Sequence, residues 1–279
     1  MVGNTFPYVL KDWSDDIALA HASGIDGFAL NMGIDDWQPA RVADAFNAAL
    51  QSGLDFKLFL SLDMSSLLCA SPQDAQSLRN LVLAHITHPN QLQYNNRAFV
   101  STFSGESCNF GEGSASQGWA SQFVNHPDLQ GKIYFVPAFF IDPTKFVDFK
   151  DVMDGDFNWN SGWPTQVTTS FAQSLVKSQP QVPVVNAKIA LANGGASSAT
   201  SLSASSSISV LEQALSKFVG STDSDEQHLE SLANLTSAKR KRTQDGGDAT
   251  TKKTYMAAVS PWFFTHYGQD SYNKNVSHP

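Results

Sequence analysis

The sequence predicts an α/β fold, and within that class a (β/α)8 barrel resembling a TIM barrel, on two observations. Four short apolar segments that begin near residues 27, 56, 98 and 132 alternate with amphipathic helical segments, as in a parallel sheet. Polar residues follow these apolar segments, and the carboxyl ends of barrel strands converge on one mouth that carries the chemistry. A doubly wound sheet has the same alternation. We favour the barrel because no Gly-x-Gly-x-x-Gly motif follows the first strand.

Local signals mark the ends of the predicted elements. The first helix has apolar residues one turn apart at Trp13 and Ile17, and Gly24 just beyond it is a stop signal. Pro39 and Pro72 lie near the starts of the next two helices, where a missing N–H is tolerated. In chain order we expect strands at 26–31, 56–63, 98–103 and 132–137, and helices at 13–22, 39–51, 73–85, 116–124 and 144–153.

The rest of the chain supplies fewer strands than a closed barrel needs. Residues 1–3 are interpreted as the tail of strand one, 156–159 as strand six and 254–259 as strand seven, with no closing helix or strand after them. We therefore expect an incomplete barrel, with strand one shortened and strand eight missing. We divide the chain into three regions: 1–176 is the first part of the barrel, 177–253 is an insertion, and 254–279 contains strand seven and a truncated C-terminus. The insertion is Ser-rich and basic, and we expect it to be partly disordered with short helices at 211–218 and 229–235.

Composition limits the class of protein. The chain has 279 residues, of which 42% are hydrophobic and 16% charged, so it can bury a sizeable core and is not disordered throughout. No apolar run approaches the roughly 18–20 residues of a membrane-spanning helix, and we expect no membrane partner. Residues 1–7 lack a basic start followed by an apolar stretch, so we expect no signal peptide in this chain.

The net charge of −8 hides a basic segment at residues 239–253. Outside this segment the chain has a larger negative charge than the net charge of the whole. Negative charge repels phosphate backbones, so we expect no nucleic-acid partner. The segment itself is interpreted as a solvated loop, with a nuclear localisation signal or a nucleic-acid-binding arm as the alternatives. Its basic residues are Lys239, Arg240, Lys241, Arg242, Lys252 and Lys253.

Carboxylates near the strand ends are the main chemical signal. Asp63 ends one strand and Glu106 lies just beyond the next, and two carboxylates across a barrel mouth are typical of glycoside hydrolysis. The alternatives are a helix or loop cap for Asp63 and a loop-ordering hydrogen bond for Glu106. Asp142, which precedes Pro143, is interpreted as a turn or helix cap. Asn31 ends the first complete strand and is a candidate substrate contact.

Aromatic side chains cluster after the predicted strands six and seven. Flat rings offer apolar area with a polar edge, which suits the faces of sugar rings. Trp163 lies between Gly162 and Pro164, so we expect it in a mouth loop, and His266 is either a sugar contact or a structural histidine. The candidate substrate-binding residues are Asn31, Trp159, Trp163, Trp262, His266 and Tyr267.

Metal and cysteine chemistry are less informative. The histidines show no His-x-His or His-x-x-x-His spacing, so we expect no metal site. Cys69 and Cys108 are either two buried thiols or one disulfide.

Several segments together resemble the fungal α-1,3-glucanases, or mutanases, of glycoside hydrolase family 71. They cover most of residues 1–176 and 254–275 in order, and the combination is far more specific than any single carboxylate. The segments are MVGNTFPY at residues 1–8, DGFALN at 26–31, FLSLDMSS at 59–66, STFSGESC at 101–108, WNSGWP at 159–164 and YMAAVSPWFFTHY at 255–267.

The resemblance implies a secreted or cell-wall (β/α)8 enzyme that hydrolyses α-1,3-glucan without a cofactor. We expect the chain to be a monomer. The resemblance places Asp63 in a motif with an acidic residue implicated in activity, matches Glu106 to the mouth, and makes a disulfide between Cys69 and Cys108 reasonable. The family also carries a Trp-Asn-Asp-Tyr-Gly-Glu-Ser-like segment at the end of strand eight, and the Asp and Glu of this segment are its best catalytic candidates. This chain lacks the segment. We therefore expect little or no hydrolysis by this chain, with a non-catalytic carbohydrate-binding remnant as the alternative.

Overall fold

The computed structural model describes residues 1–161, 222–240, 252–259, 263–267 and 274–278. The chain divides into two compact units. One comprises Met1–Trp159 and Gln227–Ala257, and the other comprises Asn160–Glu226 and Ala258–Pro279. The predicted site residues Trp163 and Trp262 lie outside the described residues.

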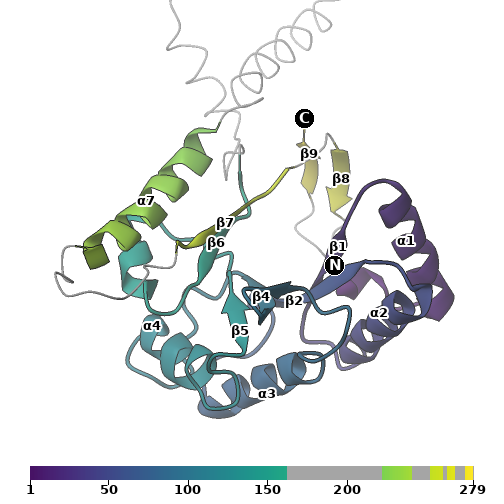
Figure 1. Ribbon diagram of the computed structural model, residues 1–279, viewed down its shortest axis with the longest axis horizontal. Helices are drawn as coiled ribbons and strands as arrows, with labels where there is room; N and C mark the ends of the chain where they lie inside the picture. Colours follow the sequence, from purple (N-terminus) through teal and green to yellow (C-terminus); the bar gives the residue numbers. More distant parts are fainter. Residues whose placement is uncertain (162–221, 241–251, 260–262, 268–273, 279) are drawn as a thin grey trace, which may run out of the picture. The chain divides into compact units, whose positions relative to one another are not determined.

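A parallel sheet forms the centre of the first unit (Figure 1). Its neighbouring parallel strands are β1 (Gly27–Met32), β2 (Lys57–Asp63), β4 (Arg97–Phe103) and β5 (Ile133–Phe135). A two-residue strand, β3 (Gln93–Tyr94), pairs antiparallel with the start of β4. The order in space thus follows the order along the chain, and the prediction of an α/β fold with a parallel sheet is confirmed.

Two further strands continue this order. β6 (Gly155–Asn158) and β7 (Thr254–Ala257) pair in parallel over four residues. Two backbone hydrogen bonds join the chain at β6 to the chain at β5: Asp154 N donates to Phe135 O at 2.8 Å, and Phe157 N donates to Pro137 O at 3.0 Å. Within the first unit the parallel strands therefore run β1, β2, β4, β5, β6, β7.

Helices follow most of the strands, and local sequence explains their ends. In α3 the Ser71 hydroxyl caps the N-terminus by accepting from Asp74 N, and the Asp74 carboxylate accepts from Ser71 N. α2 ends at Gly53, whose φ of +66° is the left-handed conformation that glycine adopts without strain. The helices of this part are α1 (Leu10–Ala22), α2 (Gln38–Ser52), α3 (Pro72–Leu83), α4 (Ala115–Gly118), the π-helical turn η2 (Trp119–Val124) and the 3-10 helix η3 (Pro143–Phe149).

The sheet has apolar side chains on both faces, which is why its strands are rich in apolar residues. The larger cluster joins strand residues such as Leu60 to helix residues such as Ile17 and Phe46. The smaller cluster contains Phe99, Tyr134 and Val136, with Phe59, Phe157 and Met256 packed against it. A strand buried on both faces is characteristic of parallel sheets covered by helices on at least one side.

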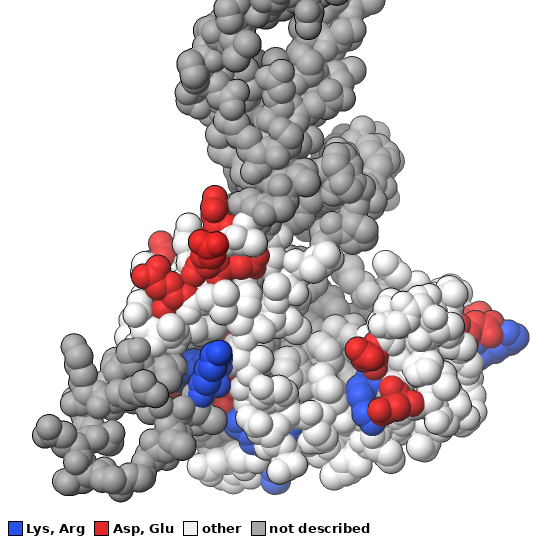
Figure 2. All heavy atoms as spheres, turned by 45° about the horizontal axis from the view of Figure 1, so that its top comes forward, with Lys and Arg blue, Asp and Glu red and all other residues white. Residues whose placement is uncertain are grey.

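Helix α7 (Asp223–Arg240) is longer than the short helix predicted at 229–235. Leu232 is buried in the larger apolar cluster and Leu235 packs against it. The first turn carries Asp223, Asp225 and Glu226. Acidic side chains there are favourable for the helix dipole. Figure 2 shows a group of Asp and Glu side chains, in red, at the upper left of the face that it draws. In the described part of the chain, every helix is too short or too polar to span a bilayer.

Three predictions about elements were wrong. Residues 1–3 are not the tail of a strand, because η1 (Val2–Asn4) is a 3-10 turn whose Val2 is buried. Strands do follow β7: β8 (Phe263–Tyr267) and β9 (Lys274–His278) form an antiparallel hairpin in the second unit. The segment 239–253 is not simply a solvated loop, because Lys239 and Arg240 end α7 and the Lys253 amine donates to Lys150 O and Met153 O.

Candidate active site

The carboxyl edge of the parallel sheet collects the predicted polar residues of the first unit. Asn31 pairs in register with Ser61, which pairs with Ser101, while Asp63 pairs with Phe103. Register partners on parallel strands point to the same face of the sheet. The structure therefore brings Asn31 and Asp63 to one edge of one sheet, where the loop that contains Glu106 also begins.

A buried polar layer lies just below this edge. Asn31 is 8% exposed, and its amide donates to the backbone O and the hydroxyl of Ser61 at 3.4 Å each. Ser101 is fully buried and donates from its hydroxyl to Val136 O at 2.7 Å. These bonds satisfy polar groups that would otherwise be costly to bury. Asn31 is thus held against the neighbouring strand.

Asp63 is the last residue of β2 and is half-buried. Its Oδ1 accepts from the backbone N of Ser65 at 3.1 Å and from the Ser65 hydroxyl. Its backbone O accepts from Ser66 N at 3.1 Å and Leu67 N at 3.0 Å. The carboxylate therefore caps the turn that follows β2, which fixes its direction at the carboxyl edge.

Glu106 lies in a loop with an unusual backbone. Ser104 has φ +61° and Gly105 has φ +110°, two consecutive residues in the left-handed half of φ space. A Cβ on Gly105 would lie 3.0 Å from both Met64 Cγ and Trp119 Cζ2. The buried indole of Trp119 also donates from Nε1 to Gly105 O at 2.8 Å. The loop is therefore locked between the turn after β2 and the Trp119 ring.

The Glu106 carboxylate joins the loops after β4 and β5. Its oxygens accept from the Ser104 hydroxyl at 3.1 and 3.3 Å, and Oε2 accepts from Phe140 N at 3.3 Å. These bonds order the backbone around the site. The loop-ordering role considered from the sequence is thus present in the geometry, and it leaves the chemical role of Glu106 to experiment.

A disulfide between Cys69 and Cys108 ties the loops that carry Asp63 and Glu106. The two Cα atoms are 5.2 Å apart, and the neighbouring Phe110 N donates to Cys69 O at 2.9 Å. Two carboxyl-bearing loops joined by a covalent bond and a backbone hydrogen bond have little freedom to separate.

Aromatic rings line the same edge farther along the sheet. Trp159, immediately after β6, is 38% exposed. Its ring lies edge-on to Phe103 at a centroid distance of 4.7 Å and contacts Phe157 at 5.3 Å. Phe103 also contacts Phe140 at 5.1 Å. Trp159 is thus a partly exposed aromatic surface beside the loop of Glu106.

Two of the remaining predicted site residues belong to the second unit, and Asp142 lies between β5 and η3 in the first. His266 and Tyr267 lie in β8 of the second unit, where they pair in register with Asn275 and Lys274. Asp142 caps η3, since its Oδ1 accepts from the backbone N of Thr144 at 2.9 Å, as the sequence predicted. The hydrogen bonds from the Thr144 hydroxyl and backbone N lower the pKa of Asp142.

Sequence reasoning missed a buried carboxylate beneath α7. Asp156 is fully buried, and its Oδ2 lies 2.7 Å from His228 Nδ1 on α7. Burial raises the pKa of Asp156, against the opposing effect of the hydrogen bond to His228. The two residues are 72 positions apart, so only the packing of α7 could have disclosed the pair.

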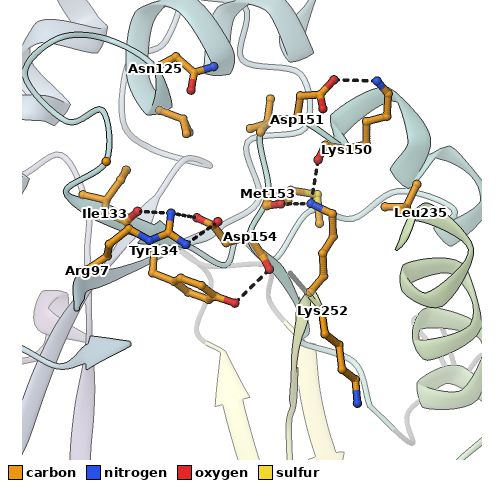
Figure 3. Close-up of a pocket in the computed structure, with 14 residues that line it drawn as sticks. Arg97, Asn125, Ile133, Tyr134, Lys150, Asp151, Met153, Asp154, Leu235 and Lys252 are labelled. Atoms are coloured by element: carbon orange, nitrogen blue, oxygen red, sulfur yellow. Dashed lines mark hydrogen bonds and ion pairs between the residues drawn. The ribbon is translucent and has the colours of Figure 1, made fainter. Parts of the chain in front are cut away.

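The cavity in Figure 3 lies at the opposite, amino edge of the sheet and has a volume of about 270 Å³. Arg97 at the start of β4 binds Asp154 through two hydrogen bonds, of 2.8 and 3.1 Å, and the Tyr134 hydroxyl reaches Asp154 O. The Lys150 amine pairs with Asp151. Because these groups bind one another, we interpret the cavity as a structural junction rather than as a substrate site.

Metal binding has no support in the described residues. Among them, no three His, Cys, Asp or Glu side chains gather in a way that could hold a metal ion.

Comparison with known proteins identifies relatives of the chain. Over 166 residues it is 44% identical to glucan endo-1,3-alpha-glucosidase agn1 of Schizosaccharomyces pombe, covering 59% of this chain and 38% of that one. It is 37% identical over 179 residues to the ascus wall endo-1,3-alpha-glucanase of the same yeast, covering 63% of this chain and 40% of that one. Mutanase Pc12g07500 of Penicillium rubens is 34% identical over 166 residues, with coverages of 59% and 33%. The matches thus span two fifths or less of each relative.

Among solved structures, the GH99 endo-alpha-mannosidase of Bacteroides thetaiotaomicron aligns with 61% of this chain and 52% of its own. The TM-score of this alignment is 0.45 and the sequence identity is 12%. The model of glycosyl hydrolase family 71 matches residues 1–186, more than half of the chain. This match confirms the resemblance seen in the sequence, and the chain therefore belongs to glycosyl hydrolase family 71.

Proposed function

We propose that the chain is a glycoside hydrolase that acts on α-1,3-glucan at the carboxyl edge of its parallel sheet. The observation that carries the proposal is the covalent tie between the loops of Asp63 and Glu106, which keeps two carboxyl groups at one edge. Glycoside hydrolysis generally needs such a pair. We also propose that the six parallel strands in chain order are part of a (β/α)8 barrel, whose mouth this edge would be.

In this proposal the reaction is a direct displacement by water. One carboxyl group protonates the leaving oxygen and the other activates water, which requires a separation of roughly 6.5–9.5 Å. Asp63 and Glu106 are the proposed pair. Trp159 would stack on a glucose ring, and Asn31 would bind a hydroxyl.

The other proposed substrate contacts are Trp163, Trp262, His266 and Tyr267. We expect no cofactor, since this reaction needs none. We further propose an extracellular or cell-wall location, by analogy with the family resemblance, and a monomeric state.

A second candidate function is binding of α-1,3-glucan without efficient hydrolysis. It is favoured by the hydrogen bonds of Glu106, whose oxygens order the loops around Ser104 and Phe140. Under this alternative Asp63 and Trp159 would contact the sugar but turnover would be slow.

Binding and turnover separate the two candidates. The wild type should sediment with insoluble α-1,3-glucan and not with cellulose, and Trp159→Ala should weaken this binding. Reducing-sugar release that falls by ~10²–10⁴ in Asp63→Asn would support hydrolysis. Glucan binding without measurable release would support the second candidate. Absence of binding to α-1,3-glucan by the folded wild type would contradict both.

A further inference from the structure

We infer that Phe6 and Trp37 form a second carbohydrate contact. Phe6 lies between η1 and α1 and Trp37 ends the loop after β1, and together they make an aromatic platform that binds a glucose ring of the same glucan chain. The inference rests on the proposed function, because it extends that site along the carboxyl edge from Asp63. It assigns a binding role to residues that the sequence analysis did not single out.

The two rings form an exposed pair. Phe6 is 67% exposed, and its ring lies edge-on to the half-buried Trp37 ring at a centroid distance of 5.2 Å and an angle of 80°. Ile34 beside them is 54% exposed. The Phe6 ring of this pair is therefore mostly exposed to solvent. A partner that covers the exposed Phe6 ring removes apolar surface from water, which favours binding.

The platform is held by a rigid loop. Gln38 is only 3% exposed, and its Oε1 accepts from Gly33 N at 2.8 Å while its Nε2 donates to Asp35 at 2.7 Å. Trp37 immediately precedes α2, so the helix fixes the backbone on its other side. Binding to a preorganised ring loses less conformational entropy than binding to a mobile one.

The platform is continuous with the proposed site. A Cβ on Gly33 would lie 2.9 Å from the Ser66 hydroxyl, so the loop after β1 contacts the turn after β2. The Ser66 hydroxyl in turn donates to Asp63 O at 3.1 Å. The loop that carries Trp37 therefore contacts the turn that begins at Asp63, so a glucan chain that runs along this edge would pass both.

The chemistry of the platform favours a saccharide over a purely apolar partner. Two exposed carboxylates, Asp35 and Asp36, directly precede Trp37. A glucose ring presents an apolar face to an aromatic ring and hydroxyl donors at its rim, and carboxylates accept from those donors. An apolar peptide could cover the rings but has no hydroxyl groups to donate to these two carboxylates.

The test is the affinity of α-1,3-gluco-oligosaccharides of increasing length, measured by titration calorimetry in an Asp63→Asn background that prevents turnover. Trp37→Ala and Phe6→Ala should each weaken binding of the longer oligosaccharides by about five- to ten-fold. Trp37→Tyr should retain most of the affinity. Leu19→Ala on α1 is the matched control, since Leu19 is 69% exposed.

Each outcome bears on the inference. Losses in the platform variants but not in Leu19→Ala, with unchanged thermal unfolding midpoints, would support it. Unchanged affinity in the platform variants, in a parent that binds the oligosaccharides, would overturn the platform alone. A folded parent that binds no oligosaccharide would overturn the proposed function and the platform with it.

Discussion

Removal of the disulfide between Cys69 and Cys108 should cost much of the stability of the first unit. The bond closes a loop with a sequence separation of 39 residues. In the chain-entropy model this restriction of the unfolded state is worth ~4 kcal/mol at 25 °C. We expect a Cys69→Ala/Cys108→Ala variant to lose about that amount in the free energy of unfolding. Alanine is preferred because Cys108 is 2% exposed, and a buried serine hydroxyl would add a cost of its own.

Guanidinium unfolding followed by circular dichroism measures this effect. Wild type under reducing conditions should unfold at the midpoint of the double variant, whereas oxidised wild type should unfold at a higher concentration. The slope of the transition should rise modestly, because the unfolded chain without the cross-link is less compact and exposes more surface. A loss below about 1 kcal/mol, or no response of the wild type to reductant, would refute the reasoning that this bond restrains the unfolded chain.

Three further perturbations follow from the same geometry. Gly105→Ala introduces a Cβ at φ +110° and 3.0 Å from Met64, so it should destabilise the protein by about 2–4 kcal/mol in the same unfolding assay. Burial and the neighbouring His88 lower the pKa of His85 to about 4, so its neutral form stabilises the fold above pH 6.5 and this contribution is lost as the pH falls from 6.5 to 4. In His85→Gln, the free energy of unfolding should therefore fall by roughly 1–2 kcal/mol less between pH 6.5 and pH 4 than in the wild type, after allowance for partial exposure. Arg97→Met should lower the free energy of unfolding, measured by thermal unfolding, by about 1–3 kcal/mol. The Asp154 carboxylate, which accepts two hydrogen bonds from Arg97, would lose its positively charged partner.

Controls make these outcomes interpretable. Gly53→Ala changes a left-handed glycine that has open space around its Cβ position, so it should cost less than Gly105→Ala. His21→Gln removes an exposed histidine of α1 and is the matched control for the loss of a histidine side chain. Equal losses for both glycine variants, or equal pH profiles for both histidine variants, would contradict the packing arguments.

The parallel sheet and the position of Asp63 were predictable from the sequence. Each strand is a short apolar run between turn signals, and the residue at its carboxyl end is fixed once the run is recognised. Asp63 closes the run at β2, and its register partner closes the run at β4. The edge that collects these residues is therefore encoded locally.

Features that depend on tertiary contacts were not predictable. The residues of α7 are largely polar, and Leu232 gains its role only by packing into a core formed elsewhere in the chain. Trp119 was expected only as part of a helix, whereas its indole holds Gly105 from 14 residues away. The 3-10 turn at Val2 has no periodic signal, because three residues are too few to show one.

Hydrogen–deuterium exchange with and without α-1,3-gluco-oligosaccharides tests the central claim most directly, because it locates binding independently of turnover. We predict slower amide exchange in the loops after β1, β2 and β4, at residues 33–38, 63–67 and 104–110, with no change at the amino-edge cavity near Arg97. Protection confined to that cavity, or none in the presence of saturating oligosaccharide, would contradict a saccharide site at the carboxyl edge.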